Sequence, residues 1–418
     1  MTLRKVRTNV KIKINKQQFF ECLVAVLLVL NGQSMWSKLE TVQGWFSWLI
    51  LGMLWIAAIG ILYCSNSGKV EKQTVFSIFL ITVYLAVYIC VRPVNFNGTL
   101  QLVLSVIAIS MIVFETKDIS GILQYYRKTI IIIATISLFF WVFGSMLSYL
   151  QPSSEIYSIW TGNGDHVLVK NYYYLYFQQQ MSNIKQIDAV RNIAFFCEAP
   201  MAAFHFSIAF LIEMFFRKRP SRINIIILVV ATLSTISITG YLVLLAGFSA
   251  KYLLSNSKQK FIHAIKVVSV PIAIGLVVCI MLYLYNLKAD SASGYARLND
   301  FAVGYQVWKK HFLFGVGYGN YDEIKKMMPL WRSSNTGFSN SIMLVVDYGG
   351  LYFGVAYLFS IIKGMIGAVK YKKYNSLSFL LIFICIFIVT NIPFIYLTLL
   401  IVLSQLEKTC LLYTSDAA

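Results

Sequence analysis

Residues 45–64 read WFSWLILGMLWIAAIGILYC, a run without a single charged side chain. A helix of about 20 predominantly apolar residues spans the roughly 30 Å hydrocarbon core of a bilayer, so this run predicts a membrane crossing. Similar runs recur along the chain, which predicts an all-α polytopic membrane protein with about 12 transmembrane helices. The expected crossings lie at about 17–36, 45–64, 74–91, 99–114, 129–150, 199–216, 222–237, 239–255, 264–286, 340–362, 377–390 and 393–406.

The composition agrees with this class. Of 418 residues, 58% are hydrophobic and 13% are charged, and the mean hydropathy is +0.69. A soluble chain carries about 25% charged residues. A membrane β-barrel does not fit, because its strands of about ten residues alternate apolar with polar side chains. The net charge of +19 is carried by clusters between apolar runs, so it indicates membrane topology and no nucleic-acid partner.

The basic clusters also predict where the chain reverses. The cations of residues 4–16 precede the first crossing and should hold the N-terminus in the cytoplasm. The stretch 223–250 is apolar throughout, yet basic clusters both precede and follow it. Since both clusters favour the cytoplasm, the chain must turn back, and the polar run 232–240 is the expected place. The same reasoning divides 377–406 at 390–393.

Two long segments, at about 151–198 and 286–339, are then extracytoplasmic loops of a single transmembrane domain, 1–409. The last residues, 410–418, resemble the translation of a sequencing-library adapter, so we expect the native chain to depart from this sequence near Thr409. We expect no disulfide framework and no metal site, because five of the seven cysteines lie inside apolar runs and the four histidines are scattered.

The second long loop is unusually basic. It holds seven cations against four acids, where an extracytoplasmic loop should have few cations. This excess predicts an anionic ligand, or else contact with lipid headgroups. Leu298, Phe301, Tyr305 and Trp308 recur at helical spacing and predict an amphipathic helix on the membrane surface. Arg297 lies off that stripe. Its planar guanidinium is suited either to binding a phosphate or to a structural ion pair with Asp300.

A glycine-rich motif, HFLFGVGYGNY, follows at 311–321. A dinucleotide site would need a βαβ unit, which a loop between membrane helices cannot supply. The run Val316–Gly319 resembles a potassium-channel filter, but Gly315 stands where the filter has threonine. The remaining interpretation is a tight turn, which either presents backbone N–H groups to a ligand or is only a turn.

The first long loop ends RNIAFFCEAP at 191–200, just before a predicted crossing. Arg191 and Glu198 flank the helix start, where backbone N–H groups favour an anion. Aromatic residues precede them, including Tyr173, and these serve either as platforms for sugar rings or as an ordinary interfacial belt. Within a later crossing, Asp347 is the deepest predicted acid, and it is either a functional candidate or a partner for a buried cation.

These features together resemble the O-antigen polymerase and ligase superfamily. The segment Arg191–Pro200 is similar to that family's Arg-x-x-(Gly/Ala)-x-Phe-x-Glu-x-Pro stretch. Ser237–Gly240 occupies the place of its polar turn between two short helices. Arg297, then the run Trp308–Asn320, then Asn340 at a helix start follow in the family's order.

The resemblance implies a GT-C-like helical bundle in the bacterial plasma membrane, with no metal or other cofactor. Its substrates would be undecaprenyl-diphosphate-linked oligosaccharides at the outer face, joined into O-antigen, capsule or exopolysaccharide by a Wzy-type polymerase. A chain-length regulator and a flippase are candidate partners. A ligase, acting in lipopolysaccharide assembly, is the first alternative, although the histidine of the ligase pattern is missing at Ser339–Asn340. A transporter of the same lipids is the second, although no internal repeat relates the two halves.

In this interpretation Arg191 and Arg297 stabilise the leaving diphosphate, and His311 and Glu198 are the candidate general bases. The expected substrate-binding residues are Gly315, Gly317, Gly319, Asn320, Asn340, Tyr173 and Trp308.

Overall fold

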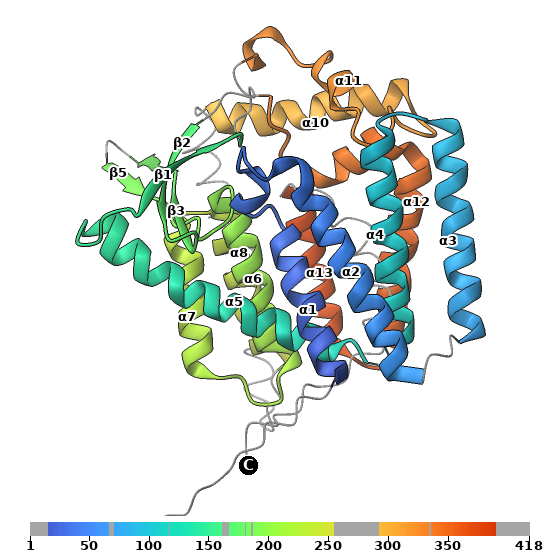
Figure 1. The fold of residues 1–418 in the computed structure, drawn as a ribbon, viewed down its shortest axis with the longest axis horizontal. Coiled ribbons are helices and arrows are strands. Elements are labelled where there is room, and N and C mark those ends of the chain that lie inside the picture. Colours follow the sequence, from blue (N-terminus) through green and yellow to red (C-terminus); the bar gives the residue numbers. More distant parts are fainter. Residues whose placement is uncertain are drawn as a thin grey trace, which may run out of the picture.

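A computed structural model of the chain describes residues 16–66, 71–116, 118–160, 167–179, 181–184, 187–254, 292–333 and 336–389. This part of the protein is mostly helical (Figure 1). The α-helices are α1 (Lys16–Asn31), α2 (Gln43–Asn66), α3 (Lys72–Val91), α4 (Phe96–Glu115), α5 (Ser120–Phe140), α6 (Ala199–Phe216), α7 (Arg222–Ser234), α8 (Ile238–Leu254), α10 (Ala292–Lys310), α11 (Tyr321–Lys325), α12 (Ser341–Lys370) and α13 (Tyr374–Val389). Shorter turns are η1 (Met35–Lys38), the π-helical η2 (Trp141–Met146) and η3 (Leu330–Arg332).

Six of these helices are long and apolar enough to cross a membrane: α2, α3, α4, α5 with its extension η2, α6 and α12. Shorter helices, α1, α7, α8 and α13, occupy four more of the predicted crossings. The predicted crossings at 264–286 and 393–406 lie outside the described residues, as does the expected break at 390–393. The helical class is therefore confirmed, and the full number of crossings stays a prediction.

Helix α6 forms the centre of the bundle. Its side chains are buried along almost its whole length, and it contacts α5, α7, α8 and α13. Two polar residues of α6 have an ion-pair or hydrogen-bond partner inside this core. Glu213 forms an ion pair with Arg127 of α5, and the His205 ring bonds the Tyr126 hydroxyl at 2.7 Å. Charged and polar groups in such surroundings need partners of this kind.

The apolar stretch 223–250 forms two antiparallel helices, as its flanking charges predicted. At one end of α7, the Ser221 N–H donates to the Glu213 carboxylate at 2.7 Å. At its other end, the Ser234 carbonyl accepts from the Asn192 N–H at 3.0 Å, near the start of α6. Helix α8 then returns along α6, with Gly240 facing Ala203 and Gly247 facing Phe210. The chain reverses at 235–237, where Ile236 has φ +50°.

The first long loop contains strands that the sequence did not predict. In one antiparallel sheet, β2 (Val167–Tyr172) lies between β1 (Ser154–Ser158) and β3 (Tyr176–Gln178). A separate hairpin pairs β4 (Met181–Ile184) with β5 (Ile187–Val190). The all-α prediction is therefore wrong for this segment. A search for runs of about 20 apolar residues cannot detect strands of three to six residues.

Helix α12 is broken at Gly350, whose φ and ψ are 59° and −155°. The glycine-rich loop that follows α10 lies against this break. The Val316 and Gly317 N–H groups donate to the carbonyls of Asp347 (2.7 Å) and Tyr348 (3.1 Å). In return, the N–H groups of Leu351 and Tyr352 donate to the carbonyls of Phe312 (2.8 Å) and Leu313 (2.9 Å).

This exchange explains two of the glycines. A Cβ atom on Gly315 would overlap with the Asp347 carbonyl oxygen, and one on Gly350 would overlap with the Leu313 backbone. Both residues also have positive φ, which disfavours any side chain. The motif is thus a turn that supplies hydrogen-bond partners to the backbone groups on both sides of the helix break. The N–H groups of Val316 and Gly317 already have partners within the chain.

Replacing Gly350 with alanine should strongly destabilise the protein. The backbone conformation alone costs about 1–3 kcal/mol for a residue with a side chain, and the clash with Leu313 adds to this. Gly354→Ala is the matched control, because a Cβ at that position on the same helix meets only the Val346 side chain, at 3.6 Å. Thermal unfolding of the two detergent-solubilised variants measures the difference. Equal melting temperatures would contradict the proposed fit at the helix break.

Candidate functional site

The segment 191–198 joins β5 to α6 at the end of the bundle that carries the sheet (Figure 1). Its backbone bonds two neighbouring segments. The Phe195 carbonyl accepts from Met35 at 2.7 Å, and the Ala194 carbonyl accepts from Phe177 at 2.8 Å. Residues 192–197 are all buried. The segment is therefore held rigidly, and it fixes the residues at its two ends, Arg191 and Glu198.

Asn192 anchors this segment to two helices. Its side-chain amide donates to Ser137 on α5 at 3.2 Å and to Ser234 on α7 at 2.9 Å. The amide oxygen accepts from the Ala194 N–H at 2.9 Å. This side chain is fully buried, so each bond satisfies a group that would otherwise be costly. The sequence offered no signal for this role beyond the position of Asn192 beside Arg191.

Arg191 binds the turn between α7 and α8. Its Nε donates to the Thr235 carbonyl at 2.9 Å, and one terminal nitrogen donates to the Ile236 carbonyl at 3.4 Å. The guanidinium thereby satisfies two backbone carbonyls at the place where the chain reverses between α7 and α8. The resemblance noted for Arg191–Pro200 and Ser237–Gly240 thus involves two segments that lie side by side.

Glu198 lies at the N-terminal end of α6 and is half-buried. Burial raises the pKa of its carboxyl group, while the positive charges of Arg191 and Arg297 oppose that rise. Burial lowers the pKa of Arg191, Glu198 opposes this change, and Arg297 adds to it. The three charged groups therefore interact, although Arg297 belongs to the other long loop. Three of the four residues that the sequence predicts to be catalytic thus influence one another electrostatically, and their catalytic roles stay predictions.

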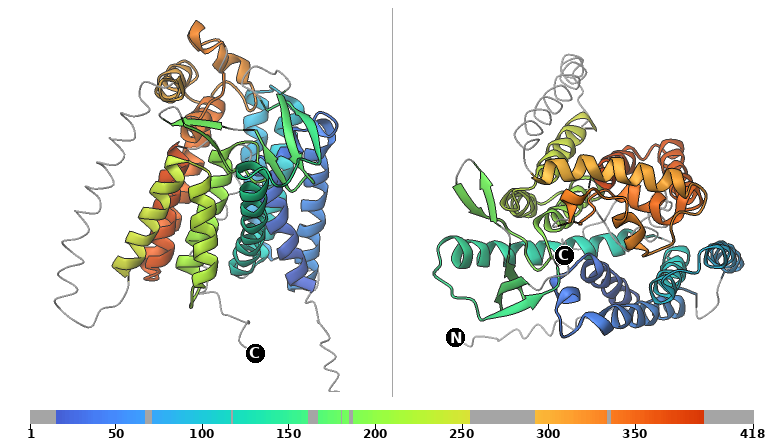
Figure 2. Two further views of the ribbon diagram at one scale, coloured as in Figure 1. Left: turned by 90° about the vertical axis from the view of Figure 1, so that its left-hand side faces the viewer. Right: turned by 90° about the horizontal axis from the view of Figure 1, so that it is seen from above.

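Arg297 is carried by α10, which lies across the end of the bundle (Figures 1 and 2). The predicted helix is confirmed. Leu298, Phe301 and Tyr305 of its apolar stripe are exposed, whereas Trp308 is partly buried. The opposite face, which includes Val303, is buried against α12. An exposed apolar stripe at the bundle end is compatible with the predicted contact with a membrane surface.

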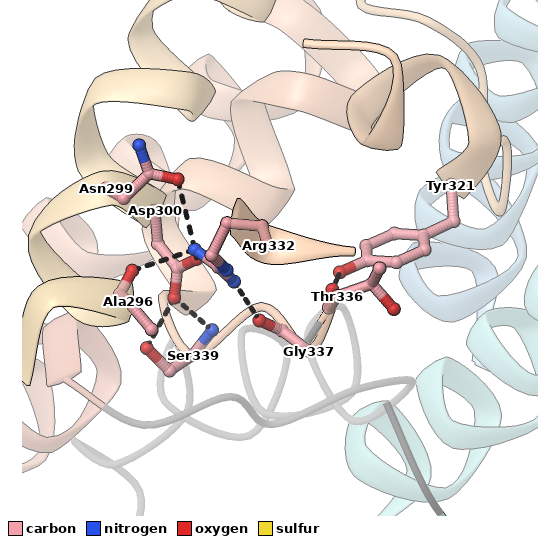
Figure 3. A network of polar contacts seen from close by, with 8 residues as sticks. All are labelled: Ala296, Asn299, Asp300, Tyr321, Arg332, Thr336, Gly337 and Ser339. Carbon is pink, nitrogen blue, oxygen red and sulfur yellow. Dashed lines mark hydrogen bonds and ion pairs between the residues drawn. The ribbon is translucent and has the colours of Figure 1, made fainter. Parts of the chain in front are cut away.

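A buried ion pair fixes the N-terminal half of α10 (Figure 3). One terminal nitrogen of Arg332 donates to Asp300 at 2.9 Å and to the Ala296 carbonyl at 3.0 Å. The second oxygen of Asp300 accepts from the N–H and the hydroxyl of Ser339, at 2.9 and 2.7 Å. The alternative pairing of Asp300 with Arg297 is thus wrong, since Arg332 takes that place. Nothing in the sequence pattern links residues 32 positions apart, so this pair was missed.

The remaining predicted residues lie elsewhere. His311 follows Arg297 by 14 residues, which is about 21 Å along a helix, and its charged neighbours include Arg92 and Glu323. Tyr173 is exposed in the turn between β2 and β3. Asn340 caps α12, since its side chain accepts from the Met343 N–H at 3.2 Å.

The glycine motif also has a packing role. Gly317 faces Val94, and Gly319 faces Asn95, in the turn between α3 and α4. The Asn320 side chain donates to the Val316 carbonyl at 3.0 Å and closes the glycine turn. These contacts leave the substrate-binding role of Gly315, Gly317, Gly319 and Asn320 a prediction, and they give the motif a structural role of its own.

Asp347 is fully buried within α12, beneath α10. Neither of its carboxylate oxygens has a hydrogen-bond partner among the residues that the structure describes. Gly304 of α10 faces it, and a Cβ atom at that position would lie 3.1 Å from one carboxylate oxygen. A buried acid without a partner is costly, which makes it a functional candidate in a membrane protein.

No protein-family model matches the chain, and no curated protein matches it significantly. The functional interpretation therefore depends on the residues themselves.

Removing the Arg332 guanidinium should loosen α10. Arg332→Met leaves the buried Asp300 carboxylate without its cation, a change that typically costs about 3–5 kcal/mol. Lys326→Met is the matched control, since Lys326 forms an exposed ion pair with Glu323 on the same loop. Thermal unfolding in detergent should show a clear loss for Arg332→Met and no measurable change for the control. A similar melting temperature in both variants would contradict the anchoring role of Arg332.

Proposed function

We propose that the chain is a metal-independent polymerase of lipid-linked oligosaccharides. Its substrates would be undecaprenyl-diphosphate-linked repeat units, joined into O-antigen or a capsular polysaccharide. The observation that carries this proposal is that Arg191 and Glu198 lie at the two ends of one buried segment, at the end of the bundle of apolar helices across which α10 carries Arg297 (Figure 1). The charge of Arg297 also acts on the pKa values of both residues. The family resemblance supports it, because these three residues come from the two segments that carry the resemblance. The finer fold assignment, a GT-C-like bundle of about 12 crossings, belongs to the same proposal.

The proposed reaction has two charge requirements. An acceptor hydroxyl attacks the sugar carbon that bears the diphosphate, the carbon–oxygen bond to the diphosphate breaks, and the bonding electrons leave with the lipid diphosphate. Arg191 and Arg297 stabilise the charge that develops on this leaving group. The hydroxyl loses its proton to a base, for which Glu198 is the candidate next to the arginines. His311 is the weaker candidate, because it lies about 21 Å along α10 from Arg297.

One position of the sequence favours a polymerase over a ligase. The ligase pattern has a histidine where this chain has Ser339. Here the Ser339 N–H and hydroxyl both bond the Asp300 carboxylate, as part of the ion-pair network that anchors α10. A transporter of the same lipids is the second candidate. The observation that favours it is Asp347, a buried acid within a long apolar helix.

We further propose that the end of the bundle carrying the sheet and α10 faces the outside, and that the N-terminus is cytoplasmic. The opposite end carries basic residues after α6 and after α12, which favour the cytoplasm. In a cysteine-free background, a membrane-impermeant thiol reagent added to whole cells should label Ser333→Cys, because Ser333 is exposed beyond α11. It should label Lys218→Cys, which lies in the turn after α6, only after lysis. Labelling of Lys218→Cys in intact cells would reverse the orientation.

Deleting the gene should leave single repeat units on the cell surface. A polymerase acts on units that another protein has already exported, so the polysaccharide ladder should collapse to the core with one unit attached. Loss of a flippase or a ligase would instead leave the bare core. Gel electrophoresis of lipopolysaccharide or capsule from the deletion strain measures this. A bare core that this gene alone restores to a full ladder would contradict the polymerase proposal.

The same gel assay tests the proposed roles of the two arginines through lysine variants. In complemented strains, Arg191→Lys and Arg297→Lys keep the charge but lose the planar fork, so both should give little or no ladder at normal protein levels. Lys170→Arg, on the exposed side of β2, should give a full ladder.

A further inference from the structure

The contact between α10 and α12 encloses the carboxyl group of Asp347. This side chain is 0% exposed, and neither of its oxygens has a hydrogen-bond partner among the described residues. Helix α10 meets it at Gly304, where a Cβ atom would lie 3.1 Å from one carboxyl oxygen and 2.8 Å from the Cβ atom of Met343. The two helices therefore pack closely around an acid that they do not bond.

The surroundings of this carboxyl group are apolar. On α10, Val303 and Val307 are buried and belong to one hydrophobic cluster with Val316 and Leu344. Leu344 lies one turn before Asp347 on α12, and the Val316 N–H donates to the Asp347 backbone carbonyl at 2.7 Å. An ionised carboxylate in such a place would be an unpaired buried charge, which is far more costly than the neutral acid.

The charged groups near this contact do not compensate such a charge. Arg332 forms its ion pair with Asp300, at 2.9 Å, and no described cation pairs with Asp347. The titratable side chains on the elements around Asp347 are Tyr88 of α3, Asp300 of α10, His311 and Tyr318 of the following loop, Tyr321 of α11 and Tyr348 of α12 itself.

A metal ion does not suit this place. Hard cations need several oxygen ligands, and the described part of the chain has no group of three His, Cys, Asp or Glu side chains that could hold a metal. The backbone carbonyls of Asp347 and Tyr348 already accept from Val316 and Gly317. The ligand that fits a single carboxyl group inside a closed contact is a proton.

We propose that Asp347 is a proton-binding site, and that the bound proton holds α10 against α12. A carboxyl group exposed to water is ionised at neutral pH, so loss of the proton and separation of the two helices occur together. Proton binding therefore favours the docked position of α10, and rising pH favours its release. Asp347 lies six residues after the start of α12, about 9 Å along the helix, so the proton exchanges with the side on which α10 lies.

This site bears on the candidate active site through α10. The helix carries Arg297, so a proton on Asp347 would keep that arginine at the end of the bundle where α6 begins. This consequence rests on the proposed function. Proton binding and helix docking themselves do not depend on it.

The first test detects the proton directly. Infrared spectra of the purified full-length protein in detergent contain the C=O stretching band of protonated carboxyl groups. At neutral pH, the wild-type protein should show one such group more than Asp347→Asn. Asp322→Asn is the matched control, because Asp322 is an acid of α11 that is 85% exposed, and it should keep the wild-type spectrum. A wild-type band equal to that of Asp347→Asn would overturn the proton site.

The second test measures docking of α10 in a cysteine-free background. Val303→Cys places a thiol on the buried face of α10, and Gln306→Cys places one on its exposed face. The ratio of their labelling rates by a water-soluble maleimide, taken at equal pH, corrects for the pH dependence of the thiol itself. This ratio should rise by up to about tenfold per pH unit once the docked carboxyl group ionises.

Substitution of Asp347 should abolish this pH dependence. The ratio should stay flat with Asp347→Asn and with Asp347→Leu, a second variant of similar size that brings no unpaired N–H groups into the contact. A ratio that rises equally in both variants, or that stays flat in the wild type, would overturn the link between the proton and docking. Neither test requires turnover, so both stand apart from the ladder test of the polymerase proposal.

Discussion

Inside a membrane protein, every backbone N–H and C=O group needs a hydrogen-bond partner. At one place in the described structure, a break in a helix leaves several of these groups without their usual helical partners. Helix α12 breaks at Gly350, and the loop after α10 bonds the groups on both sides of the break. This exchange fixes the C-terminal end of α10. The ion pair between Arg332 and Asp300 fixes its N-terminal half. A helix held at both places carries Arg297 to a defined position at the end of the bundle where α6 begins with Glu198 as its cap (Figure 1), so the candidate site depends on the break in α12.

The same constraint operates at the turn between α7 and α8. That turn reverses the chain among packed helices, where its carbonyls would lack partners. Arg191 donates to two of them, and Asn192 binds the end of α7 through both its backbone and its side chain. Arg191 therefore has a structural role as well as the proposed catalytic one. Its lysine variant tests both, which is why the protein level has to be measured beside the ladder.

Hydropathy and charge predicted the helices well, because a membrane crossing leaves a long uniform signal. The division of 223–250 into two helices followed from two basic clusters, and the structure places the reversal within the predicted polar run. The strands of the first loop were missed, since each is too short for that signal. The pair Arg332–Asp300 was missed because the contact joins distant residues through the fold. The grouping of Arg191, Glu198 and Arg297 was expected from the excess of loop cations and the family resemblance, whereas His311 lies at the other end of α10.

The charges of Arg191, Glu198 and Arg297 suggest how the basicity of Glu198 would change when the donor binds. In the free protein, two arginines oppose the effect of burial on Glu198 and keep its carboxyl group more acidic than burial alone would. A bound diphosphate would neutralise the positive charges of these arginines and add negative charge beside the carboxylate. Both effects raise the pKa of Glu198 and make it a stronger base. Under the proposed function, the ionised carboxylate would therefore be a stronger base in the donor complex than in the free protein.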